Sequence, residues 1–112
     1  MSQITSHILD TSHGKPASGV TVVLYRQHER KWEELARGVT DNDGRVKELL
    51  GKEAVLSFGA YKMKFLTKAY FDLYGLSSFY PYVEIVFEIT SGEHYHIPLL
   101  LSPYGYTTYR GS

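Results

Sequence analysis

The sequence predicts a single all-β domain, a sandwich of short strands with one helix. Apolar and polar residues alternate along several short segments, most regularly over Val83–Ile89, as expected for a strand with one buried face. Turn-forming residues such as those of Asp41–Gly44 separate these segments at short intervals. The 112 residues, 43% of them hydrophobic, suffice for one core and predict one domain over residues 1–112.

Seven segments have the composition and spacing of strands, and Arg45 opens a further short segment directly after the tight turn Asp41–Gly44. Asn, Asp and Gly favour such a turn because they tolerate a positive φ. The first strand ends in the turn-rich stretch Thr11–Pro16. The predicted strands are Ile4–Asp10, Val20–Gln27, Trp32–Thr40 (the weakest), Tyr61–Phe65, Val83–Ile89, His94–Ser102 and Gly105–Arg110.

One helix is predicted, over Thr67–Gly75. Ala69, Tyr70 and Leu73 fall at helical spacing within it. Thr67 is a candidate N-terminal cap and Gly75 suits the C-terminal stop. A single helix among many strands favours a β-sandwich over alternating βα units.

Composition narrows the classes of function. Twelve basic and twelve acidic side chains cancel, so we expect no nucleic-acid partner. The absence of cysteine excludes disulfides and thiolate metal sites. No apolar run reaches the roughly 18 residues that span a bilayer, and residues 1–7 lack the features of a secretory signal, so we expect a cytoplasmic protein without membrane association. Ten tyrosines favour strands and extensive contact surfaces.

Three side chains are candidates for chemistry. His7 and His96 lie on predicted strands, and an imidazole exchanges protons near neutral pH. Arg45 follows a tight turn, where a fixed guanidinium can bind an oxygen-rich planar ligand. A lone strand histidine is more often structural than catalytic, and a lone arginine is most often a surface cation. By the same reasoning His13 and His28 are expected to be solvated.

His94 and His96 lie two residues apart and so share one face of a strand. Such a His-x-His pair occurs in zinc sites, but zinc needs further ligands and the sequence nominates none. We therefore expect no metal. The segment Tyr109–Ser112 is either an ordinary polar end or a segment that folds over a neighbouring surface and presents a carboxylate.

Several motifs resemble those of one family over nearly the whole chain. Residues 6–17, Ser-His-Ile-Leu-Asp-Thr-Ser-His-Gly-Lys-Pro-Ala, and residues 94–112, from His-Tyr-His-Ile-Pro to Tyr-Arg-Gly-Ser, resemble the two signature stretches of the 5-hydroxyisourate hydrolases, in the transthyretin-related family. Asp43–Arg45 resembles the arginine-bearing turn of that family, and Phe79–Phe87 resembles its sixth strand. The closing motif is long and specific.

The resemblance implies a transthyretin-like sandwich of two four-stranded sheets that forms a homotetramer, a dimer of dimers, with active sites in a channel between dimers. It implies hydrolysis of 5-hydroxyisourate to 2-oxo-4-hydroxy-4-carboxy-5-ureidoimidazoline in urate (purine) catabolism, without a metal or organic cofactor. Carried over by motif, the catalytic residues are His7, Arg45, His96 and Ser112, and the substrate-binding residues are Tyr109, Arg110 and Gly111.

These residue types suit the addition of water to a ring carbonyl. We expect His7 to activate the water and His96 to polarise the substrate or act as the acid, with the reverse assignment left open. Arg45 would stabilise the developing negative charge, Ser112 would orient water or an imidazole, and Tyr109 would form a wall of the pocket. The strongest alternative function is that of a transthyretin-like carrier of aromatic ligands. The carrier resembles this chain but lacks the equivalents of His7, Arg45, His96 and the terminal tetrapeptide. A structural sandwich used for adhesion is a weaker alternative.

Overall fold

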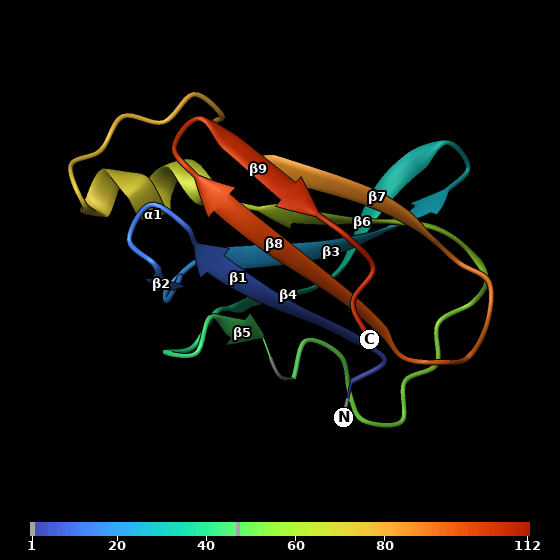
Figure 1. Cartoon of the computed structure of the whole chain (residues 1–112). Coiled ribbons are helices and arrows are strands. Elements are labelled where there is room, and N and C mark those ends of the chain that lie inside the picture. Colours follow the sequence, from blue (N-terminus) through green and yellow to red (C-terminus); the bar gives the residue numbers. More distant parts are fainter. Residues whose placement is uncertain (1, 47) are drawn as a thin grey trace.

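The computed structural model describes residues 2–46 and 48–112 of the chain, which form two β-sheets packed face to face (Figure 1). One sheet has the strand order β2-β1-β8-β9, and β5 also pairs with β1. The other has the order β4-β3-β6-β7. The elements in chain order are β1 (Ile4–Asp10), β2 (Lys15–Pro16), β3 (Thr21–His28), β4 (Lys31–Val39), β5 (Arg45–Val46), β6 (Gly59–Phe65), α1 (Thr67–Leu73), β7 (Val83–Ile89), β8 (Tyr95–Ser102) and β9 (Gly105–Thr108).

The predicted β-sandwich is confirmed. The sheet that contains β1 has five strands rather than four, because two-residue strands β2 and β5 flank β1. The first long strand, β1, pairs in parallel with β8, in a register that runs from Ile4 opposite Tyr95 to Asp10 opposite Leu101. This pairing brings residues from the two ends of the sequence side by side, and the C-terminus lies near the start of β8 (Figure 1).

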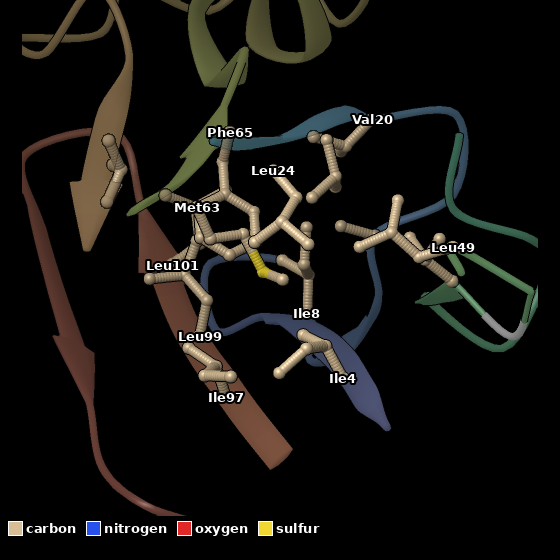
Figure 2. Packing of buried hydrophobic residues seen from close by; sticks show 14 of the residues in the cluster. Ile4, Ile8, Val20, Leu24, Leu49, Met63, Phe65, Ile97, Leu99 and Leu101 are labelled. Atoms are coloured by element: carbon tan, nitrogen blue, oxygen red, sulfur yellow. The ribbon is translucent and has the colours of Figure 1, made fainter. Parts of the chain in front are cut away.

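The core lies between the sheets, and the alternation of the strands supplies it. Ile4 and Ile8 of β1 and Leu99 of β8 point toward Leu24 of β3 and Met63 of β6, and all five are fully buried (Figure 2). Each such side chain contributes about 1.5–3 kcal/mol through burial. Buried and partly exposed positions alternate along β1 and along most of β8, so the odd-numbered residues of β1 and the even-numbered residues of β8 face outward.

Several local predictions differ from the structure. The stretch expected as a turn after β1 includes the short strand β2, because Leu9 pairs with Pro16. The last strand ends at Thr108 rather than Arg110. Thr67 does not cap α1: the N-cap is Leu66, without a side-chain capping bond, and the Thr67 side chain is buried. At seven residues, α1 is too short to cross a membrane, and the described residues contain no helix that would.

A buried carboxylate joins β1 to the helix. Asp10 is fully buried and accepts hydrogen bonds from the Tyr70 hydroxyl of α1 and from the Nδ1 of His13, both at 2.6 Å. Ser12 donates to it through its hydroxyl at 2.6 Å and its backbone N–H at 2.9 Å. Burial opposes the charged form, but these hydrogen bonds lower the pKa of Asp10 to about 2. His13 is exposed, as expected from the sequence, and its Nδ1 also joins this network through Asp10.

Candidate active site

The outer face of the β1–β8 pair carries the two predicted catalytic histidines. Thr5 and His7 are on the outward side of β1, and His96 is on the outward side of β8. Thr5 lies opposite His96 in the parallel register, and His7 lies opposite Pro98. The parallel pairing of β1 with β8 therefore places His7 and His96 near one another on the same surface of the sheet.

The turn before β5 places Arg45 on this surface. The side chain of Asp41 accepts the backbone N–H of Arg45 at 3.1 Å, and its backbone carbonyl accepts the N–H of Gly44 at 2.9 Å. Gly44 has a φ of +74°, and a Cβ there would lie 2.5 Å from the carbonyl oxygen of Ile8. Only glycine lets the turn approach β1 this closely, and the N–H of Ile8 then donates to the Gly44 carbonyl at 2.8 Å.

The result is a cross-strand pair between His7 and Arg45. The two residues are direct partners in the antiparallel β1–β5 ladder. Partners across a ladder point to the same face, so the imidazole and the guanidinium lie next to one another. The predicted arginine-bearing turn thus places the guanidinium of Arg45 beside the imidazole of His7.

The last four residues, 109–112, fold back over β8 and are called the C-terminal strap here. The backbone N–H of Gly111 donates to the carbonyl of His96 at 2.9 Å, and the two residues form an isolated antiparallel bridge. Figure 1 shows the chain leaving β9 and returning toward the start of β8. This return brings Ser112 to the histidine surface, as expected for a segment that folds over a neighbouring surface.

A cavity of about 260 Å³ lies where these elements meet. Three of the four predicted catalytic residues, Arg45, His96 and Ser112, are in its wall, and His7 is adjacent through its pairing with Arg45. The cavity is slightly smaller than the roughly 300–1,000 Å³ typical of ligand sites, which suits a small substrate. Its lining residues are Thr5, Ser6, Arg45, Val46, His94, His96 and Ser112.

The other two strap side chains lie elsewhere. Tyr109 and Arg110 line a second cavity of about 290 Å³, which is bounded by β7, β8 and β9. Arg110 forms an ion pair with Glu93, and its guanidinium carbon lies 4.5 Å from the ring centroid of Tyr95. These contacts fasten the strap to β8 and direct the guanidinium away from the cavity that contains Arg45.

The surroundings of His96 favour its neutral form. Burial lowers the pKa of the imidazole most, and the nearby charges of Arg45, His94 and His7 lower it further. A pKa below the ordinary value of 6.5 keeps the ring unprotonated near neutral pH. His96 is thus available as a proton acceptor under conditions in which many exposed histidines are partly charged.

Sequence reasoning missed Thr5. Its hydroxyl lies 2.8 Å from the Nε2 of His94 and 2.8 Å from the Nδ1 of His96. The position of Thr5 two residues before His7, on the same face of the strand, was visible in the sequence. The parallel partner strand was not, so nothing in the sequence alone linked this hydroxyl to His94 and His96.

The predicted placement of His94 and His96 on one face is confirmed by their rings, whose centroids are 6.3 Å apart with planes inclined by 21°. Within residues 2–46 and 48–112, no group of three or more His, Cys, Asp or Glu side chains is arranged to hold a metal ion. The pair instead shares the Thr5 hydroxyl.

Comparison with known proteins gives a consistent set of relatives. The chain is 48% identical over 112 residues to the probable 5-hydroxyisourate hydrolase of Schizosaccharomyces pombe, covering 97% of this chain and 90% of that one. It is 46% identical to the 5-hydroxyisourate hydrolase of Mus musculus, covering 99% and 96%. The structure of Klebsiella pneumoniae 5-hydroxyisourate hydrolase matches with a TM-score of 0.86 at 41% identity, over 97% of this chain and 98% of that one.

A carrier of the same fold also matches. The crystal structure of sea bream transthyretin in complex with thyroxine superimposes with a TM-score of 0.92 at 33% identity, over 98% of this chain and 95% of that one. Backbone shape therefore does not separate the two classes, whereas sequence identity is higher to the hydrolases.

Fold and site together define a transthyretin-like sandwich whose outer sheet face holds a histidine–arginine cluster. A family model described as HIUase/Transthyretin family matches residues 4–111. The chain belongs to this family, and its relatives place it among the hydrolases of the family.

Proposed function

We propose that this protein hydrolyses 5-hydroxyisourate to 2-oxo-4-hydroxy-4-carboxy-5-ureidoimidazoline, a step of urate catabolism. The observation that carries the proposal is the shared cavity of Arg45, His96 and Ser112, with His7 paired to Arg45. An imidazole of lowered pKa beside a fixed guanidinium is suited to the attack of water on a carbonyl. The names of the relatives support the choice of substrate.

Arg45 binds the substrate in this proposal. Its backbone is held by Asp41 and by the close approach of Gly44 to β1, so the base of the side chain has a defined position. A guanidinium offers a planar set of donors that matches the oxygens of an oxidised purine. The same positive charge stabilises the oxyanion that forms as water adds to the ring carbonyl.

His96 is the general base and His7 the general acid, the reverse of the assignment favoured from the sequence. The Nδ1 of His96 is engaged by Thr5, and its Nε2 has no hydrogen-bond partner within the described residues. Nε2 takes a proton from water as the water oxygen bonds to the ring carbonyl carbon. The C–N bond then breaks, and His7 delivers a proton to the departing nitrogen.

The C-terminal strap completes the site. Ser112 lies in the cavity wall, where it orients the water or the imidazole, and Gly111 fixes the strap against His96. Arg110 acts through its contacts with Glu93 and Tyr95, which hold the strap in place. Tyr109, 58% exposed, is positioned to form a wall toward a bound substrate or a second subunit.

The active form is a homotetramer, a dimer of dimers, in this proposal. The strands β7 and β9 end their sheets, so each has an unpaired edge. Large apolar and aromatic side chains on and near these strands are exposed, including Phe79, Val86 and Tyr104 at 70%, 60% and 68%. Light scattering at micromolar concentration tests this proposal, and a monomer would contradict it.

A carrier of aromatic ligands is the second candidate because of the close match in shape to thyroxine-bound transthyretin. The imidazoles and the guanidinium make the site polar, and a polar site suits an oxygen-rich heterocycle better than an apolar hormone. Two assays separate the candidates: the absorbance decay of freshly made 5-hydroxyisourate, and titration with thyroxine. Enzyme-dependent decay without thyroxine binding supports the hydrolase, and the opposite pair of results supports the carrier.

A further inference from the structure

Thr5 lies between two imidazoles, at 2.8 Å from each. A hydroxyl has one proton and two lone pairs, so it donates to one ring nitrogen and accepts from the other. When both rings are neutral, only one of the two facing nitrogens, His94 Nε2 and His96 Nδ1, therefore carries a proton. The hydroxyl couples the protonation of the two histidines.

We propose that Thr5 and His94 form a proton relay that carries charge away from His96 after it has activated water. The inference rests on the function proposed above, in which His96 is the base. In the resting state, His96 Nδ1–H donates to Thr5, and the Thr5 hydroxyl donates to His94 Nε2. This arrangement leaves the lone pair of His96 on Nε2, the nitrogen that has no partner in the described part of the chain.

The transfer balances. His96 Nε2 gains a proton from water, and the imidazolium passes its Nδ1 proton to the oxygen of Thr5. The Thr5 hydroxyl at once gives its original proton to His94 Nε2. His96 is then neutral with a proton on Nε2, Thr5 is again a neutral hydroxyl, and His94 is the imidazolium. After product release, His96 loses its Nε2 proton to solvent. Thr5 gives its proton to His96 Nδ1 and takes the Nε2 proton of His94, which restores the resting arrangement.

Burial and charge determine the direction of transfer. The His96 imidazole is half-buried and stands near the guanidinium of Arg45 on β5 and the imidazole of His7 on β1, so a positive charge there is disfavoured. His94 precedes β8 and is exposed. It lines both the 260 Å³ cavity and a neighbouring cavity of about 210 Å³ whose wall includes Lys52, Ala54 and Val55. Water solvates an imidazolium at His94 at a lower free energy than at His96.

Kinetics provides the first test, in the full-length parent and three variants. Thr5→Val keeps the β-branched shape and removes the hydroxyl, and Thr5→Ser restores it. His94→Gln keeps a hydrogen-bonding group that takes up no proton near neutral pH. We expect Thr5→Val and His94→Gln each to lower kcat about tenfold with KM within about twofold, because proton transfer and not binding is impaired. Thr5→Ser should recover most of the lost rate.

The double variant Thr5→Val/His94→Gln should be no slower than either single variant, because both remove the same relay. His28→Gln is the matched control. His28 is exposed at the end of β3, so this variant should turn over substrate at the parental rate. Parental kcat in Thr5→Val would overturn the relay. So would a rise in KM at unchanged kcat, which is the effect of a purely structural role.

Nitrogen NMR tests the relay without any substrate. The ¹⁵N chemical shifts distinguish protonated from unprotonated ring nitrogens. In the parent protein, we expect the neutral His96 ring to carry its proton on Nδ1. In Thr5→Val this preference should be lost. If the parent failed to hydrolyse 5-hydroxyisourate but kept this tautomer, the proposed substrate would be wrong and the coupling right. An unprotonated His96 Nδ1 in the parent would overturn the relay whatever the substrate.

Discussion

Gly111 lies directly on the imidazole of His96. A Cβ at position 111 would be 2.5 Å from Cδ2 of the ring, closer than real side chains approach, while the Gly111 N–H is 2.9 Å from the His96 carbonyl. Gly111 therefore both bonds to His96 and leaves room for its ring. The strap and the proposed base are in direct contact, so a displacement of the strap should also displace the His96 ring.

Gly111→Ala should displace the strap or rotate the His96 ring. We expect the methyl group to lower kcat for 5-hydroxyisourate at least about tenfold, because misplacement of a catalytic group by about 1 Å has large effects on rate. The thermal midpoint should change little, since the strap lies outside the core. Gly51→Ala is the matched control, because a Cβ there meets no atom within 4 Å. Equal activity of the two variants would contradict the role assigned to Gly111.

Removal of either imidazole tests the assignment of base and acid. His96→Ala and His7→Ala should each lower kcat by about 10²–10⁴-fold, the usual contribution of general acid–base catalysis. Both variants should keep the fold and the oligomeric state, because both side chains lie on the outer face of the sheet. Absorbance decay above the spontaneous rate measures the loss, and circular dichroism checks the fold. Parental decay in both variants would show that these histidines are not catalytic.

The positive charge of Arg45 should be visible in the pH dependence. The charge lowers the pKa of His96, so its removal in Arg45→Gln raises that pKa toward 6.5. The acid limb of kcat/KM, which reports protonation of the free base, should then move to higher pH. Burial, the largest cause of the lowered pKa, is unchanged by this substitution, so the shift is partial. A limb that moves to lower pH would exclude His96 as the titrating base.

The Asp10 network predicts a stability effect away from the site. Tyr70→Phe removes the hydroxyl that donates to the buried carboxylate, and should lower the free energy of unfolding by about 1–3 kcal/mol. Urea denaturation measures it, with Tyr104→Phe as a control at an exposed position.

The pH dependence of stability has a definite sign as well. The pKa of Asp10 falls from 3.8 in the unfolded chain to about 2 in the fold, so its contribution is complete above about pH 4. The contribution declines as the pH falls through 3.8 toward 2. Asp10→Asn should flatten this part of the stability profile, and an unchanged acid limb would contradict the network.

Local pattern was enough to predict much of the fold. The alternation in β7 predicts which of its side chains face the core, because a strand places successive residues on opposite faces. In β1 the inward face includes the polar residues Ser6 and Asp10, so polarity alone does not predict it. The start of α1 was not predictable in this way. Thr67 has a capping side chain, but the chain enters the helix directly from β6, and this side chain is buried.

The candidate site was predicted only in part. His7, His96 and the arginine-bearing turn follow from motifs, and the structure brings them to one surface. Thr5 did not stand out, because its role depends on the parallel pairing of two strands about 90 residues apart. The direction of Arg110 toward Glu93 likewise depends on the return path of the strap, which no local pattern encodes.

The decay of freshly generated 5-hydroxyisourate, followed by ultraviolet absorbance, tests the central proposal most directly. The parent protein at sub-micromolar concentration should accelerate decay well above the spontaneous rate, in proportion to protein concentration, and His96→Ala should return it close to that rate. Decay at the spontaneous rate in the presence of folded parent protein would contradict the proposal that this histidine–arginine surface is a hydrolase site for 5-hydroxyisourate.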